Sequence, residues 1–234
     1  MSEYISIVTG GSRGIGRAVV EALLRRGGRV HFCSRSASSV DKTLHALRKI
    51  HPNSVFGEAV DVGEQAQVDA FVETVLESEG QVDCLVNNAG IGYFAPVDEL
   101  SGEDWRRLMR TNLDGAFYMT RAVAPSMRER GEGLIINVAS LAGKASIAGG
   151  AAYNASKFGL VGLSDASMLD LRGDGVRVSA ILPGSVETEF GSGLGGSSWK
   201  LHPEDVAQTV LHLLDTPARA LPSRIELRPT STGR

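Results

Sequence analysis

The sequence predicts an α/β fold built on a doubly wound parallel sheet of seven strands, with helices on both faces. Short apolar runs alternate with longer segments whose apolar residues recur at helical spacing, as in parallel strands joined by crossover helices. The strand-like runs SIVTG, LIINV and VSAIL are apolar without interruption, which indicates strands buried on both faces. Because neither an internal repeat nor an inter-domain linker is visible, we expect one domain over residues 1–234.

The first half of the chain alternates regularly between the two kinds of element. Each expected helix has apolar residues three or four apart, as at Ile15, Val19 and Leu23. The second helix is expected to end at His51-Pro52, since proline disfavours a helical residue before it. In chain order, the strands and helices are expected over residues 5–9, 15–26, 29–33, 40–50, 55–60, 65–78 and 84–86.

The second half begins with a long helical segment, for which we expect an interruption or bend near Pro125, because proline removes a helical hydrogen bond. The last expected helix opens with Pro203, followed by acidic residues that suit a helix N-terminus. Residues 191–198 (GSGLGGSS) are expected to form a loop over a site, within a short substrate loop at about 185–200. The elements are expected over residues 103–130, 134–138, 151–171, 176–182, 203–214 and 225–227.

Composition excludes several classes of function. The 24 Lys and Arg against 27 Asp and Glu give a net charge of −3, so a basic nucleic-acid-binding face is not expected. The chain contains no apolar run long enough to span a membrane, and its N-terminus does not resemble a signal peptide, so we expect a cytoplasmic protein. The two cysteines and five scattered histidines do not have metal-ligand spacing, so no metal is assigned.

A glycine-rich turn follows the first strand, where Gly10, Gly14 and Gly16 have the spacing GxxxGxG. Such a turn lets the backbone approach a pyrophosphate, which then meets the free N–H groups of the following helix. Gly16 would in addition allow close packing between helix and strand. The spacing differs from the GxGxxG dinucleotide pattern, so a purely structural turn is the alternative.

The second strand is followed by Ser34-Arg35-Ser36, without the carboxylate that binds the ribose 2′-hydroxyl in NAD sites. Arg35, with Arg13 nearby, could instead bind a 2′-phosphate, and this favours NADP over NAD. The alternative is that both are solvated surface arginines. Asp61-Val62, after the third strand, would lie near the adenine, although Asp61 also suits a helix cap.

Tyr153 and Lys157 are four residues apart and therefore share one helix face, and Ser140 follows the fifth strand. All three can meet at the crevice beyond the carboxyl ends of the strands. The pKa of a phenol, about 10, is too high for acid–base work at neutral pH, and a nearby ammonium lowers it. A YxxxK pair alone is weak support, because Tyr and Lys often share an exposed helix face.

The sequence resembles the short-chain dehydrogenase/reductase family over nearly its whole length. The resemblance is carried by TGGSRGIG at 9–16, DV at 61–62, NNAG at 87–90, Asn112, Ser140, the Tyr153–Lys157 pair and Pro183-Gly184. It implies a Rossmann fold and hydride transfer between a nicotinamide and a carbonyl or secondary alcohol. The cofactor contacts expected are Gly10, Ser12, Arg13, Gly14, Ile15, Gly16, Arg35, Asp61, Val62, Asn87, Ala89, Gly90, Tyr153, Lys157, Pro183, Gly184, Val186 and Thr188.

The resemblance implies that Tyr153 is the general acid or base, that Lys157 lowers its pKa and holds the nicotinamide ribose, and that Ser140 binds the substrate oxygen. It also implies that Asn112 disturbs its helix and holds a water linking Lys157 to solvent. Asn87 would line the adenosine ribose together with Ala89 and Gly90 and would buttress the sheet.

The substrate remains open at this stage. The chain end and the segment 182–190 resemble 3-hydroxy acid dehydrogenases, whereas TGGSRGIGRA resembles 3-oxoacyl-[acyl-carrier-protein] reductases. A non-catalytic NADP-binding sensor is the alternative from another class. An apolar substrate pocket is expected, with Lys144 or Lys200 as a cation for a substrate carboxylate, and with walls from Tyr93, Phe94, Leu141, Ile147, Phe190 and Trp199.

We also expect subunit association. The helix expected over 151–171 is apolar on more than one side, and helices buried on several sides occur in interfaces. The family resemblance implies a homotetramer or homodimer formed through this helix and the long one before it.

Overall fold

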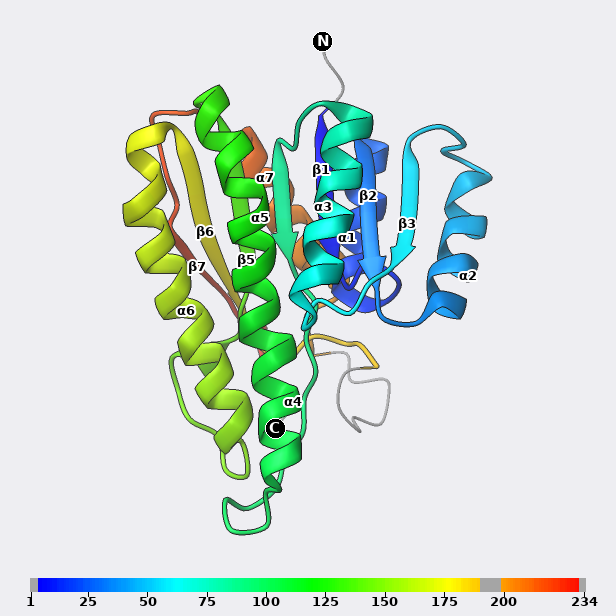
Figure 1. The fold of residues 1–234 in the computed structure, drawn as a ribbon. Helices are drawn as coiled ribbons and strands as arrows, with labels where there is room; N and C mark the ends of the chain where they lie inside the picture. The colour runs from blue at the N-terminus through cyan, green and yellow to red at the C-terminus, as the bar shows by residue number, and fades with distance from the viewer. Residues whose placement is uncertain (1–3, 190–198, 232–234) are drawn as a thin grey trace.

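A computed structural model describes residues 4–189 and 199–231, and it confirms the predicted α/β architecture (Figure 1). All seven strands pair in parallel in the order β3-β2-β1-β4-β5-β6-β7. This is the order of a Rossmann-type single domain, with a seventh strand at one edge. The strands are β1 (Ile5–Thr9), β2 (Arg29–Ser34), β3 (Val55–Ala59), β4 (Cys84–Asn87), β5 (Gly133–Val138), β6 (Val176–Pro183) and β7 (Arg224–Leu227).

Helices cover both faces of the sheet, because side chains of successive strand residues point to opposite faces. Val8 and Ile136 pack with α1, α2 and α7, whereas their chain neighbours Ile7 and Ile135 pack with α3, α5 and the end of α6. Figure 1 shows α3, α5 and α6 in front of the sheet. The helices are α1 (Gly14–Arg25), α2 (Ala37–Arg48), α3 (Gln65–Glu79), α4 (Gly102–Met109), α5 (Gly115–Arg130), α6 (Ala151–Leu171) and α7 (Pro203–Asp215).

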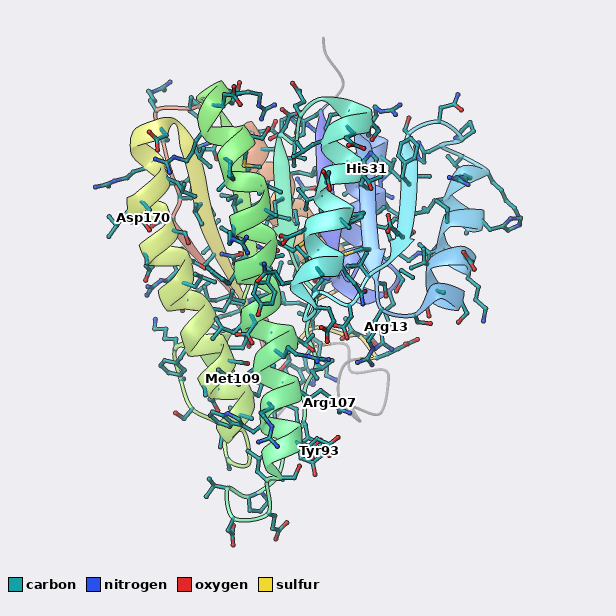
Figure 2. The ribbon with its side chains drawn as sticks, in the orientation of Figure 1. Arg13, His31, Tyr93, Arg107, Met109 and Asp170 are labelled. Atoms are coloured by element: carbon teal, nitrogen blue, oxygen red, sulfur yellow. The ribbon has the colours of Figure 1, made fainter. Side chains whose placement is uncertain are left out.

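The strand order reverses at β1, which lies between β2 and β4. The connections leaving β1 and β4 therefore run to opposite sides, and a crevice opens beyond the carboxyl ends of these strands. Figure 2 shows Arg13 at this end of the sheet, below β1 and β2. No helix in the ranges that the structure describes is long and apolar enough to cross a membrane.

The long helix differs from its prediction. The break lies at a π-helical turn, Arg110–Asp114, between α4 and α5, and not at Pro125, which lies inside α5. Pro125 is on the exposed face of α5, where water can bind the carbonyl that it leaves unpaired. The turn at 110–114 has another cause. The side chain of Asn112 forms hydrogen bonds to both backbone groups of Ile91, and these bonds hold the turn against a neighbouring loop.

The other predicted boundaries are within three residues of those observed. The largest shift is at the start of α2, which was expected at residue 40 and begins at Ala37. Ser36 caps this helix, because its hydroxyl accepts a hydrogen bond from the Ser39 N–H at 3.3 Å.

Candidate active site

A cavity of about 410 Å³ lies beyond the carboxyl ends of the strands. It is lined by segments that follow strands β1 to β6, together with the first turns of α6. Most of the predicted cofactor and catalytic residues meet there. They are Gly10, Ser12, Arg13, Gly14, Ile15, Arg35, Asp61, Val62, Ala89, Gly90, Ser140, Tyr153, Lys157, Pro183, Gly184, Val186 and Thr188.

The glycine-rich turn leaves room for a phosphate. Gly10 and Gly14 have φ angles of 66° and 53°, a region that residues with a side chain rarely adopt. Arg13 at the N-cap of α1 makes no side-chain capping bond, and the first turn of α1 has no acidic residue. The N–H groups at this end of the helix are thus without a side-chain cap and border the cavity, which suits a pyrophosphate.

Gly16 lies where α1 packs closely against the turn after β1, and its assignment as a cofactor contact stays a prediction. A Cβ atom added there would lie 2.2 Å from the carbonyl oxygen of Gly10. The absence of a side chain lets α1 lie against the turn. The predicted packing role of Gly16 is therefore confirmed.

Two residues that the sequence reasoning did not assign hold the crevice in shape. The hydroxyl of Thr9 accepts hydrogen bonds from the N–H groups of Asn88 at 3.0 Å and Ala89 at 2.9 Å. The amide of Asn88 donates back to the carbonyl of Thr9 at 2.9 Å. The turns after β1 and β4 are therefore linked to each other. The signal in the sequence is a polar residue at the carboxyl end of each strand.

Asn87 lies at the carboxyl end of β4, and its assignment to the adenosine ribose stays a prediction. Its side chain is buried, and its amide donates to Asn137 at 2.9 Å and to the Thr120 hydroxyl at 3.2 Å. Asn87 and Asn137 are paired in register on β4 and β5, so the contact joins adjacent strands. The predicted role in buttressing the sheet is the one that these contacts support.

At the end of the cavity near β2, Arg35 is exposed, and Ser34 beside it accepts a hydrogen bond from the Ser12 hydroxyl at 2.9 Å. Arg13 forms an ion pair with Glu189 at 3.2 Å, and both side chains are largely exposed. Sequence reasoning had not identified Glu189. This end of the cavity therefore holds two arginines, one of which is already paired with an acid.

The carboxylate of Asp61 has two partners among nearby residues. One carboxylate oxygen accepts from the Gly63 N–H at 3.0 Å, and the other lies 3.5 Å from the guanidinium of Arg110. This is a turn before α3 and not the helix cap considered as the alternative, because the N-cap residue of α3 is Glu64, and it coexists with a position on the cavity wall.

At the opposite end, Tyr153 and Lys157 lie on the first two turns of α6. The ammonium of Lys157 donates to the carbonyl of Val138 at 3.0 Å and lies 5.9 Å from the centre of the Tyr153 ring. Burial lowers the pKa of Lys157 to about 8, because a cation loses hydration there. A Cβ added to Gly90 would lie 3.8 Å from this ammonium, so the glycine keeps the space beside it open.

The pKa of Tyr153 is raised, the opposite of the direction expected from Lys157. Burial disfavours the phenolate, and a side-chain hydrogen bond with Ser140 only partly offsets this. The hydroxyl of Ser140 is held in place by the N–H of Ala142, which donates to it at 3.1 Å. Tyrosine and serine hydroxyls therefore face the same point, where a carbonyl oxygen could accept from both.

Asn112 lies behind the cavity wall, which its neighbour Thr111 forms. Its amide bonds the backbone of Ile91 and donates to the Ser156 hydroxyl at 3.1 Å. The disturbed helix is present as the π-helical turn, and the Asn112 side chain holds the loop at Ile91 in position through these contacts. Its link to Lys157 through water stays a prediction.

The predicted substrate walls are only partly present. The ring of Phe94 lies 5.5 Å from that of Tyr153, and Tyr93, Phe94 and Ile147 are exposed. Lys144 forms an ion pair with Glu226 on β7, whereas Lys200 lines the cavity. Trp199 and Leu141 do not line the cavity. Phe190 and the loop 191–198 lie outside the described residues.

Comparisons with known proteins agree with this geometry. The family profile described as short chain dehydrogenase matches residues 5–196. A D-threitol dehydrogenase of Mycolicibacterium smegmatis is 38% identical over 190 residues, which cover 80% of this chain and 72% of the relative. A 3alpha-hydroxysteroid dehydrogenase of Mediterraneibacter gnavus is 32% identical over 225 residues, which cover 91% and 90% of the two chains.

A solved structure resembles the whole chain. The alcohol dehydrogenase of Thermococcus sibiricus, in complex with 5-hydroxy-NADP, has a TM-score of 0.92 at 31% identity, covering 99% of this chain and 98% of that one. The family profile spans most of the strands and the whole Ser140, Tyr153 and Lys157 cluster. The protein therefore belongs to the short-chain dehydrogenase/reductase family of oxidoreductases.

Proposed function

We propose that the protein is an NADP(H)-dependent oxidoreductase that interconverts a carbonyl compound and its secondary alcohol. One observation carries the proposal. The hydroxyls of Ser140 and Tyr153 and the ammonium of Lys157 lie at one end of a cavity whose other end combines an uncapped helix N-terminus with Arg35. The end with the helix N-terminus and Arg35 suits the phosphates of a dinucleotide. The end with the hydroxyls and the ammonium suits acid–base chemistry.

When bound, the nicotinamide would supply or accept the hydride. In reduction, the hydroxyl of Tyr153 would donate a proton to the carbonyl oxygen, and Ser140 would hold that oxygen by a second hydrogen bond. The high pKa of the buried Tyr153 keeps this group protonated and ready to donate. Lys157 adds a positive charge 5.9 Å from the phenol ring, which favours the phenolate left after transfer.

The same cavity supports NADP over NAD. Residues Ser34 and Arg35 follow β2 without a carboxylate, and a guanidinium binds phosphate oxygens well. The Thermococcus sibiricus relative was solved with an NADP derivative, which supports the same choice. NAD(H) is the less favoured cofactor.

The test is oxidation of NADPH and NADH, followed by absorbance, against ketones, diketones, 3-oxo acids and 3-oxoacyl thioesters. Turnover with NADPH, lost when Tyr153 is changed to phenylalanine, is the expected result. Tight NADPH binding without turnover on any compound would instead favour a non-catalytic NADP-binding sensor. Turnover of thioesters alone would favour a 3-oxoacyl-[acyl-carrier-protein] reductase.

Replacing the cation beside β2 tests the cofactor preference. Arg35→Ser is expected to weaken NADPH binding by about 10- to 100-fold, the equivalent of one charge-assisted hydrogen-bonded contact. The dissociation constant of NADH should change by less than about 3-fold, because NADH has no 2′-phosphate for Arg35 to contact. Fluorescence titration of both cofactors measures this.

The matched control is Arg48→Ser, which removes another exposed arginine at the end of α2, away from the cavity. It should leave both dissociation constants unchanged. Equal losses of NADPH and NADH affinity in Arg35→Ser would contradict the role assigned to Arg35.

We also propose that the protein forms a homodimer or homotetramer. Large apolar side chains are exposed on the helices α4 to α6, as expected of surfaces covered by a second copy. They are Trp105, Phe117, Phe158 and Leu169. Sedimentation at micromolar concentration tests this, and a single monomeric species would contradict it.

A further inference from the structure

The cavity has more positive than negative side chains. Among residues 4–189 and 199–231, four cations, Arg13, Arg35, Lys157 and Lys200, line it against two acids, Asp61 and Glu189. Two of the cations already have protein partners: Arg13 pairs with Glu189, and Lys157 donates to the carbonyl of Val138. The proposed function assigns Arg35 to the 2′-phosphate of NADP. The proposed function assigns no role to Lys200, the remaining one of these four cations.

The backbone places Lys200 on the β6 side of the cavity, and β6 is the neighbour of the strand that leads to Ser140. The next residue, Leu201, donates its N–H to the Ser185 carbonyl at 3.0 Å and accepts from the Glu187 N–H at 2.8 Å. Lys200 is thereby fixed beside the segment that follows β6. Strand β6 pairs with β5, which ends just before Ser140, whereas Arg35 follows β2 on the far side of β1.

The two acids of the segment beside Lys200 have other partners. Glu189 pairs with Arg13, and a carboxylate oxygen of Glu187 lies 3.8 Å from Nδ1 of His202. Within residues 4–189 and 199–231, no carboxylate lies within ion-pair distance of Lys200. Lys144, the other lysine considered for a substrate carboxylate, is neutralised by Glu226 and lies off the cavity wall.

We propose that Lys200 binds a carboxylate on the substrate, so that the preferred carbonyl compounds are oxo acids and not their neutral esters. The inference rests on the proposed function and deepens it. A half-buried lysine that lines a cavity and has no carboxylate partner among the described residues attracts an anionic ligand into it. Ser140 and Tyr153 in the same cavity would bind the carbonyl oxygen of that ligand.

A matched pair of substrates tests the assignment. Reduction of 3-oxobutanoate and of its methyl ester is measured at saturating NADPH in the wild type, Lys200→Met and two lysine controls. In the wild type, kcat/KM should favour the acid. Lys200→Met should raise KM for the acid by at least about 10-fold, the loss of one charge-assisted contact, with the KM of the ester changed by less than about 3-fold.

The control variants separate the rival explanations. Lys42→Met removes an exposed lysine of α2 far from the catalytic end and should change neither KM. Lys144→Met should also spare the acid preference, and a loss there in place of Lys200→Met would overturn the assignment. A weakened dissociation constant for NADPH in Lys200→Met, with the acid KM unchanged, would place the lysine on a cofactor phosphate and overturn it too.

A binding measurement keeps this test apart from the proposed function. Calorimetry follows 3-hydroxybutanoate binding to the Tyr153→Phe protein loaded with NADP, with and without Lys200→Met. Weaker binding by about 10-fold in the double variant supports the assignment even if neither substrate turns over. Equal binding in the two proteins overturns it, whatever the activity assay shows.

Discussion

Tyr153→Phe is expected to lower kcat by about 10²- to 10⁴-fold, the range for loss of a general acid–base group. The change removes a single oxygen, the one that hydrogen-bonds to Ser140 at the catalytic end of the cavity. The ring remains to pack against Phe94, whose centre lies 5.5 Å away. NADPH affinity should therefore change by less than about 3-fold, because the phenol hydroxyl is one of many expected contacts to the dinucleotide.

Tyr4→Phe is the matched control. The Tyr4 hydroxyl donates to the carbonyl of Asp83 at 3.3 Å and lies outside the cavity, so its removal should leave kcat intact. Steady-state kinetics with NADPH compares the two variants directly. If Tyr153→Phe keeps more than a tenth of the wild-type kcat, this phenol is not the proton donor.

A pH profile adds a second measure of the same group. Burial raises the pKa of Tyr153, so the phenol in the protein without ligands stays protonated through neutral pH. Reduction should then be undiminished from pH 6 to 7 and fall at higher pH, first where Lys157 loses its proton near pH 8 and then where the Tyr153 donor is lost.

The sheet could be predicted from the sequence because its strands are apolar without interruption and its helices have regular spacing. The site could be predicted in outline because polar residues follow several strands, and the ends of parallel strands share one edge of the sheet. Ser140 and Tyr153 were found in this way. Their distance along the chain says nothing of the hydrogen bond that joins them.

What could not be predicted depends on contacts between distant residues. Asn87 was expected to buttress the sheet, but nothing in the sequence indicates that its amide bonds Asn137, which is fifty residues away in the chain. Local propensity pointed to Pro125, and only the family resemblance implied a disturbed helix at Asn112, whose contact with Ile91 the sequence does not contain. The sign of the Tyr153 pKa shift needed the extent of burial, which a one-turn spacing between Tyr153 and Lys157 does not contain.

Lys157→Met is expected to lower kcat by at least about 100-fold and at the same time to raise the free energy of unfolding at pH 7. The lysine is buried, and its pKa falls from an ordinary 10.5 to about 8. A fall of this size corresponds to roughly 3 kcal/mol of folding free energy. Loss of the hydrogen bond to the Val138 carbonyl costs about 1 kcal/mol. The free energy of unfolding is therefore expected to rise by a net amount of about 2 kcal/mol.

The pH dependence of the stability difference follows from which state of the chain holds the Lys157 proton. Below pH 8 both the folded and the unfolded wild type carry the ammonium, and the whole burial penalty is present. Between pH 8 and 10.5 the unfolded chain still holds a proton that the folded chain has released, so wild-type stability rises with pH in this window. The methionine variant has no such rise, and its advantage should shrink across the window.

Urea unfolding of both proteins at several pH values between 6 and 10.5 measures this difference, and the other titrating groups cancel because they are common to both. A variant that is less stable than the wild type at every pH would mean that Lys157 supports the fold. A variant that is more stable but inactive would mean that the fold tolerates a charge that weakens it. Such a charge is expected only where a ligand or a reaction uses it, which is the role proposed for Lys157 beside Tyr153.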